Sequence, residues 1–148
     1  MIQSKQRRIK MAFRRFAVCL ALLAPMTDAP AMCLDGRHPG ARDEFMSSAA
    51  VIVGRVSKQS ELQEDAADPN GVSAILYRVE VRRRLKGTVD HFIQLRSDNT
   101  STRFPMELGE DYLLFLSRDG HTYFVDSCGN SAPAKQAASV IAEIGIKK

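Results

Sequence analysis

The residues from Ser73 to Gly87 constrain the fold more than any other stretch, because they carry the clearest strand signal in the chain. Even positions from 78 to 86 are all charged, whereas the odd positions include Ile75, Tyr77, Val79, Val81 and Leu85. A period of two places one set of side chains in a core and the other in water. Arg83 interrupts the apolar set and predicts a bulge, a twist or a strand end. Long, curved strands of this kind are typical of small barrels and sandwiches.

The first 31 residues have the composition of a secretory signal peptide. Six of the 21 Lys and Arg residues lie within the first 15 positions, the apolar run F-A-V-C-L-A-L-L-A follows, and A-P-A ends at Ala31. A basic segment, a short apolar segment and an A-x-A site are the parts of such a signal. The apolar run is too short to span a membrane. We expect cleavage of 1–31, from a start at Met1 or Met11, and a single periplasmic or extracellular domain over 32–148.

Cleavage also changes the charge of the protein. The whole chain has a net charge of +4, but 32–148 holds 15 basic and 16 acidic residues once the six basic residues and Asp28 are removed. A nearly neutral domain has no overall attraction for nucleic acid, so we expect no nucleic-acid partner.

The two cysteines that remain after cleavage are Cys33 and Cys128, since Cys19 lies in the signal. An even number of cysteines in an exported protein favours a disulfide over metal or redox chemistry. This disulfide would close nearly the whole domain, which stabilises it on the order of 4 kcal/mol.

The rest of the domain predicts four further strands and two helices. The strands are expected at 49–56, 91–96, 109–118 and 121–126, with a hairpin turn at Asp119-Gly120 before the last. Loops are expected at 57–71 and 97–108. A short helix is expected at 41–48, and an amphipathic helix at 132–144, capped by Ser131 and ended by Gly145. The predicted core includes Val51, Val53, Ile75, Tyr77, Val79, Val81, Ile93, Leu95, Leu114, Leu116 and Phe124.

Four stretches together resemble the netrin-like or TIMP-like family in its compact bacterial form. They are A-V-I-V-G-R-V at 50–56, Y-R-V-E-V-R-R-R-L-K-G at 77–87, L-G-E-D-Y-L-L-F-L at 108–116 and C-G-N at 128–130. The resemblance implies an all-β fold, the five-stranded OB-fold Greek-key β-barrel, in agreement with the five predicted strands. Animal members of the family inhibit metalloproteinases: their N-terminal cysteine chelates the active-site zinc through its amine and carbonyl, and adjacent loops fill the substrate cleft.

Two family features are absent from this sequence. The family usually begins C-x-C, whereas Cys33 stands alone after Met32, and no cysteine precedes the G-E-D-Y-L segment. We therefore expect a non-enzymatic, exported protein-binding module, with a metalloendopeptidase inhibitor as the alternative. The candidate partner-binding residues lie in the N-terminal arm and the two loops: Met32, Cys33, Leu34, Glu64, Asp65, Asp68, Arg103 and Phe104.

The sequence shows no signal for catalysis or for a cofactor. The nucleophile motif G-x-S-x-G is missing, and no serine or cysteine has a neighbouring base, so we expect no enzymatic activity. The acidic D-P-N-G segment lacks the first and last ligands of an EF-hand, and we expect no metal. The three histidines have no ligand spacing: His38, His91 and His121.

A third function remains open from the charges on the 73–87 strand. Arg82, Arg84 and Lys86 form a basic cluster, and OB-folds bind oligonucleotides and oligosaccharides. These residues are the candidate site of a module for glycans or other anionic polymers. The simpler interpretation of the cluster is a solvated strand face.

Overall fold

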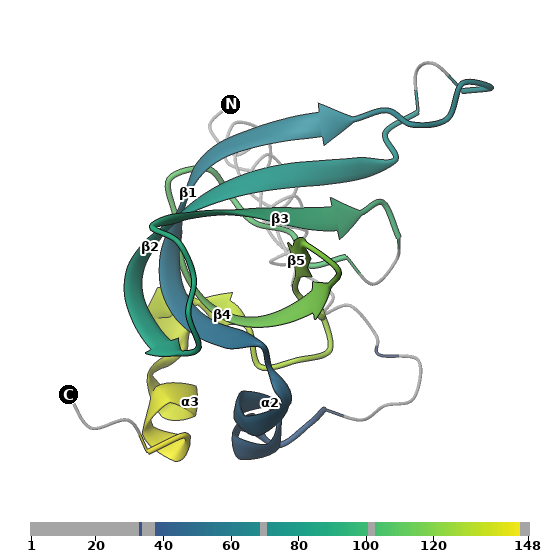
Figure 1. Cartoon of the computed structure of the whole chain (residues 1–148). Helices are drawn as coiled ribbons and strands as arrows, with labels where there is room; N and C mark the ends of the chain where they lie inside the picture. Colours follow the sequence, from purple (N-terminus) through teal and green to yellow (C-terminus); the bar gives the residue numbers. More distant parts are fainter. Residues whose placement is uncertain (1–32, 34–37, 69–70, 101–102, 146–148) are drawn as a thin grey trace, which may run out of the picture. The chain divides into compact units, whose positions relative to one another are not determined.

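The computed structural model describes residues 33, 38–68, 71–100 and 103–145 (Figure 1). They belong to the unit formed by 31–148. The predicted signal peptide, Met32 and Leu34 lie outside the described residues. In the part of the chain that is described, none of the helices has the length and apolar content needed to cross a bilayer.

Six strands form one sheet within these residues. They are β1 (Ala50–Leu62), β2 (Ala74–Lys86), β3 (Phe92–Asp98), β4 (Asp111–Asp119), β5 (Thr122–Phe124) and β6 (Ala132–Pro133). Their order is β1-β2-β3-β5-β4-β6, and β1 also pairs with β4, so the first five strands close into a barrel. The β3–β5 pair is parallel and the other pairs are antiparallel. The five predicted strands are confirmed, and β6 is an additional one.

The β1–β2 hairpin is longer than the sequence predicted. β1 continues to Leu62, which pairs with Ala74, so the expected loop at 57–71 is wrong over its first six residues. The polar residues from Ser57 onward are exposed, and Figure 1 shows this end of the hairpin projecting from the barrel. A projecting hairpin has water on both faces, so its strand lacks the apolar alternation that identifies a half-buried strand.

Register shifts bend this hairpin around the barrel. Val53 pairs with Arg83 and Gly54 pairs with Val81, which leaves Arg82 as an extra residue in β2. The irregularity predicted at Arg83 is therefore confirmed as a bulge beside it. On the facing strand, a Cβ atom added to Gly54 would lie 2.5 Å from Cγ1 of Val79, so β1 requires glycine at this close approach.

We predict that Gly54→Ala lowers the free energy of unfolding by about 1–3 kcal/mol, because the new methyl group overpacks a core in which Val79 is fully buried. Urea denaturation measures this change. The matched control is Gly54→Ala in a Val79→Ala background, where the space left by the valine should reduce the cost. An equal cost in both backgrounds would place the strain elsewhere.

The interior of the barrel holds the main hydrophobic core. Its buried members are Ala50, Ile52, Val56, Tyr77, Val79, Val81, Val89, Ile93, Leu95, Met106, Tyr112, Leu114 and Leu116. Phe124 was predicted to be buried, and this is wrong, since 40% of it is exposed. Arg118 pairs with Tyr123 and Asp119 with Thr122, so the turn lies at Gly120-His121, one residue later than expected. This shift does not change which face of the sheet each residue occupies: Tyr123 lies on the side of β4 that carries Leu114 and Leu116 and packs against the core, and Phe124 faces outward.

A second hydrophobic cluster joins the outside of β4 and β1 to the helices. Its buried residues are Val51, Leu113, Phe115 and Ala137. Partly buried residues pack against them from β1, β2 and both helices: Phe45, Val53, Leu85, Val140, Ile141 and Ile144. β4 is therefore covered on both faces, which explains the uninterrupted apolar run L-L-F-L. Figure 1 shows α2 (Ala41–Ser47) and α3 (Ala138–Glu143) at one end of the barrel.

The short N-terminal helix is confirmed as α2, but the predicted C-terminal helix at 132–144 is only partly correct. Ala132 and Pro133 pair with β4, a 3-10 turn, η2 (Ala134–Gln136), follows, and α3 begins at Ala138. A residue before proline favours extended backbone, and pairing with Leu113 of β4 makes the extended chain at Ala132 a strand, β6. Ser131 does not cap a helix; its Oγ accepts a hydrogen bond from the backbone N–H of Phe115 at 2.9 Å.

Candidate functional site

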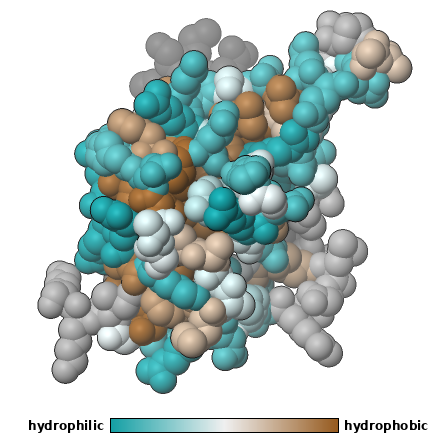
Figure 2. Space-filling view, viewed as in Figure 1, coloured by the Kyte–Doolittle hydropathy of each residue, from teal (hydrophilic) through white to brown (hydrophobic). Residues whose placement is uncertain are grey.

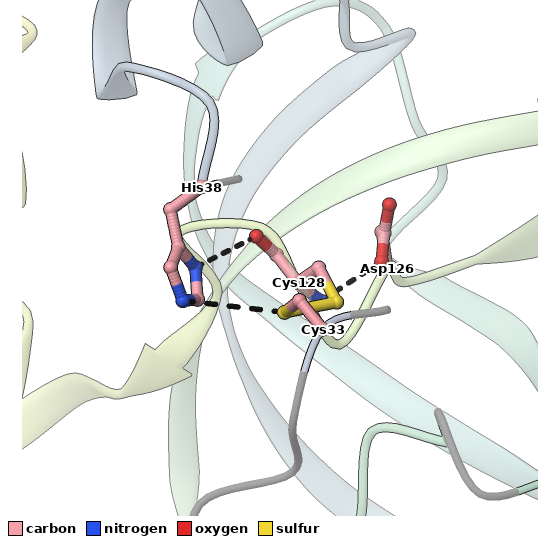
Figure 3. The surroundings of a disulfide bond; sticks show 4 residues. All are labelled: Cys33, His38, Asp126 and Cys128. Atoms are coloured by element: carbon pink, nitrogen blue, oxygen red, sulfur yellow. Dashed lines mark hydrogen bonds between the residues drawn. A yellow bond between two sulfur atoms is a disulfide. The ribbon is translucent and has the colours of Figure 1, made fainter. Parts of the chain in front are cut away.

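The disulfide joins Cys33, which precedes α2, to Cys128 in the segment that follows β5. Cys33 and Cys128 are paired as predicted, with Cα atoms 5.7 Å apart. His38 Nδ1 donates a hydrogen bond to the Cys128 carbonyl at 3.0 Å, and Asp126 Oδ1 accepts one from the Cys128 N–H at 2.8 Å (Figure 3). These contacts hold Cys33 and His38 against the segment from Asp126 to Cys128.

Asn130 connects the same segment to α2. Its backbone N–H and its Nδ2 both donate to Glu44 Oε2 at 2.6 Å, and Nδ2 also donates to the Pro39 carbonyl at 2.9 Å. Gly129 leaves the space for this arrangement, because a Cβ atom there would overlap the Glu44 carboxylate. The C-G-N triplet is therefore a structural link between both ends of the domain.

Asp126 also lies at the edge of a surface formed by residues of β3, β5 and the segments that follow these strands. A cavity of about 230 Å³ lies between Arg96, Arg103, Phe124 and Asp126. A second cavity of about 360 Å³ shares Arg96, Asp98 and Phe124 with the first. We name these five residues, Arg96, Asp98, Arg103, Phe124 and Asp126, the Phe124 surface. Its centre is an exposed aromatic ring, and its edge is formed by charged groups of both signs.

Arg96 fixes the electrostatics of the Phe124 surface. Its two terminal nitrogens donate to both carboxylate oxygens of Glu64 at 2.8 and 2.7 Å, and its Nε donates to Asp98 Oδ1 at 2.7 Å. The hydrogen bond from Arg96 holds the pKa of Glu64 below its ordinary value, and both carboxylates raise the pKa of Arg96. Glu64 and Arg96 are therefore both charged at neutral pH. The contact also brings Glu64, near the hairpin end, to the edge of the Phe124 surface.

The structure places the predicted partner-binding residues in different surroundings. Arg103 belongs to the Phe124 surface, where its Nη1 donates to Asn99 Oδ1 at 3.1 Å. Asp65 and Asp68 instead shape the turn of the hairpin: Asp65 Oδ1 accepts from the Ala67 N–H, and the Asp68 carbonyl accepts from the Gly71 N–H. Phe104 is partly buried against the barrel core. Its ring centroid lies 6.0 Å from that of Tyr112.

The three residues of the predicted basic cluster have different contacts in the structure. Arg82 Nη1 donates to Glu80 Oε1 at 2.8 Å, while Arg84 is exposed. Lys86 Nζ donates to three backbone carbonyls at the C-terminal end of α2; these belong to Phe45, Met46 and Ser48, at 2.6, 2.7 and 2.7 Å. The ammonium of Lys86 is thus engaged in joining β2 to α2.

A second exposed aromatic residue, Phe92, was missed by the sequence analysis. It is 41% exposed, and the Arg78 guanidinium lies 4.2 Å from its ring centroid. A cavity of about 320 Å³ lies beside this pair and is also lined by Lys58, Leu76 and Gln94. We name these five residues the Phe92 surface. The signal was available, because Ile93 and Leu95 face inward in H-F-I-Q-L-R and alternation then turns Phe92 outward.

Both surfaces combine an exposed aromatic ring with charged side chains. Figure 2 shows patches of hydrophobic residues between hydrophilic ones on the visible face. Hydrophobic residues are also visible on the projecting hairpin. Among the described residues, no group of three His, Cys, Asp or Glu side chains could hold a metal ion.

No protein-family model matches this sequence, and no curated protein matches it.

Proposed function

We propose that this chain is an exported, non-enzymatic module that binds a protein partner at the Phe124 surface. The observation that carries the proposal is the convergence of segments distant in sequence. The Cys33–Cys128 link, Glu64 of the hairpin and Arg103 of the 97–108 loop all reach the neighbourhood of one exposed ring. The sequence analysis predicted partner-binding residues in these same segments.

We further propose that the barrel is an OB-fold of the netrin-like or TIMP-like kind. The closed order β1-β2-β3-β5-β4-β1 and the parallel contact of Leu95 with Tyr123 support this assignment. The disulfide supports export, since such bonds persist in oxidising compartments.

The chemistry of the Phe124 surface favours a protein over a small molecule. An aromatic anchor surrounded by charged and hydrogen-bonding side chains is the usual anatomy of a protein interface. Both cavities are open depressions that share Phe124, and charges of both signs surround it. A stable interface buries about 1,200–2,000 Å² in total, so the partner would extend from Phe124 over Arg103 and the end of the hairpin.

We predict that Phe124→Ala weakens partner binding by about thirtyfold, the effect of losing a central hot-spot residue. The partner is identified by retention of envelope proteins on the immobilised mature domain, and the affinities of wild type and variant for the purified partner are then compared. Met46→Ala is the matched control, because Met46 is 74% exposed on α2, away from the Phe124 surface.

Equal affinity of Phe124→Ala and wild type for that partner would contradict the proposed surface. The identity of the partner decides the narrower alternative: a zinc metalloendopeptidase that loses activity when bound would make the module an inhibitor. A partner of another kind, released by Phe124→Ala, would support the binding module without inhibition.

A further inference from the structure

We propose that the Phe92 surface is a second binding site, which takes an acidic oligosaccharide through a carboxylate on one of its sugars. The site is formed by β1, β2 and β3 and does not depend on the function of the Phe124 surface. It also differs from the basic cluster at the end of β2.

Neighbouring arginines form ion pairs with carboxylates, but the two cations that line this cavity, Lys58 and Arg78, do not do so within the described residues. Arg55 is paired with Asp111 at 2.6 Å, Arg82 with Glu80 at 2.8 Å, and Arg96 with Glu64 at 2.7 Å. Within the described residues, neither Lys58 nor Arg78 has an acidic partner.

The nearest carboxylate on β2 is already occupied. Glu80 lies opposite Phe92 in the β2–β3 register. Its Oε1 accepts from Arg82, and His91 Nε2 lies 3.7 Å from the same oxygen. The positive charge beside the cavity is therefore left for an anion from outside the chain.

Arg78 is held in a geometry suited to a carboxylate. The guanidinium lies over the Phe92 ring, and within the described residues no hydrogen bond engages its N–H groups. The N–H groups of a guanidinium match the two oxygens of a carboxylate. Lys58 pairs with Arg78 across the β1–β2 register and Gln94 pairs with it across the β2–β3 register, so a second cation and an amide flank the guanidinium.

The remaining groups in the cavity suit a sugar. The amide of Gln94 can both donate to and accept from hydroxyl groups, and the Ser60 hydroxyl that also lines the cavity can do the same. Leu76 and Phe92 provide apolar surface for the C–H groups of a sugar ring. The cavity of about 320 Å³ is of the size that holds a small ligand.

The same details disfavour a nucleic acid. Single strands bind to successive aromatic faces, whereas Phe92 is the one aromatic residue among the described residues that line this cavity. Arg78 covers one face of its ring, and His91 meets it edge-on with centroids 4.6 Å apart. In addition, 32–148 has no excess of basic over acidic residues.

The test is isothermal titration of residues 32–148, disulfide intact, with an oligogalacturonate hexamer. We expect binding that weakens with added salt, and an affinity about tenfold lower in both Arg78→Gln and Lys58→Gln. Neutral maltohexaose should bind at least about tenfold more weakly than the acidic hexamer, because it offers no carboxylate. Thermal melting of each variant shows whether it is folded, and Lys58 is exposed, so its replacement leaves the core intact.

Two arginine variants serve as controls. Arg118 lies 5.5 Å from the ring centroid of Tyr123, a similar stack without this cavity, and Arg118→Gln should bind as wild type does. Arg84→Gln should also retain binding. Loss of binding in Arg84→Gln but not in Arg78→Gln would overturn the proposal in favour of the end of β2.

Three further outcomes would overturn the proposal. Failure of the wild-type domain to bind the acidic hexamer is the first. Equal binding of maltohexaose would remove the role of the carboxylate. Tighter binding of single-stranded DNA than of the acidic hexamer, lost in Arg78→Gln, would assign the same residues to a nucleic acid instead.

Discussion

Replacing Cys33 and Cys128 together by serine is expected to lower the free energy of unfolding by about 4 kcal/mol. The two cysteines are separated by 95 residues, so the disulfide closes a loop that contains nearly the whole barrel. Removing it returns that closure entropy to the unfolded chain. Urea or guanidinium denaturation of the oxidised protein and the double variant measures the difference.

The double variant should lose stability but keep its fold, because the barrel core contains neither cysteine. The hydrogen bonds of Glu44 with Asn130 also remain available to hold α2 beside the 128–130 segment. We therefore expect the double variant to be folded at room temperature, with a lower denaturation midpoint.

Chemical reduction of the wild-type protein is the matched control and should give the same loss as the double variant. A loss below about 1 kcal/mol in both would contradict the prediction, since the loop-closure term for so long a loop is several times larger. It would show that the unfolded chain keeps its two ends together without the covalent bond.

The strands with a regular pattern were the part of the fold that could be predicted from the sequence. In β2 the alternation of apolar and charged residues is a local property, so it predicts a strand without knowledge of the tertiary contacts. The C-terminal region was different: Ala132 and Pro133 become a strand because β4 has an open edge there, and pairing with Tyr112 and Leu113 is a long-range event. The projecting part of β1 is likewise a strand only because β2 is long enough to pair with it.

The candidate site was predictable only in part, for a similar reason. The Asp119-Gly120 signal located the hairpin to within one residue, but which of Tyr123 and Phe124 enters the core depends on their partners in β4. Tyr123 pairs with Arg118, on the same side of β4 as Leu114 and Leu116, so Tyr123 faces the barrel and Phe124 faces outward. The neighbours of Phe92 depend on the β2–β3 register, which places Arg78 opposite Gln94 and is absent from local sequence. Lys86 could not be separated from Arg82 and Arg84 until α2 was placed beside it.

Phe115→Ala is expected to lower the free energy of unfolding by about 3–5 kcal/mol, the usual range for removing a buried phenylalanine. Phe115 is 1% exposed, and it lies outside the barrel, between β4 and the helices. Truncation would leave a cavity that α2 and α3 cannot close fully. Arg42 Nε donates to the Glu143 carbonyl at 2.7 Å, so the two helices are held to each other as well as to the strand.

The location of Phe115 also determines which region loosens. The barrel core lies on the opposite face of β4. The protection of its amides from hydrogen exchange should therefore fall only as much as the global stability falls. The amides of α3 should lose more, because this six-residue helix packs through Val140 and Ile141, and through Ile144 just after it, on the Phe115 cluster. Phe92→Ala is the control, with an expected cost of about 1 kcal/mol or less for an exposed ring. Equal losses in Phe115→Ala and Phe92→Ala would mean that the helices are not held on the barrel by this cluster.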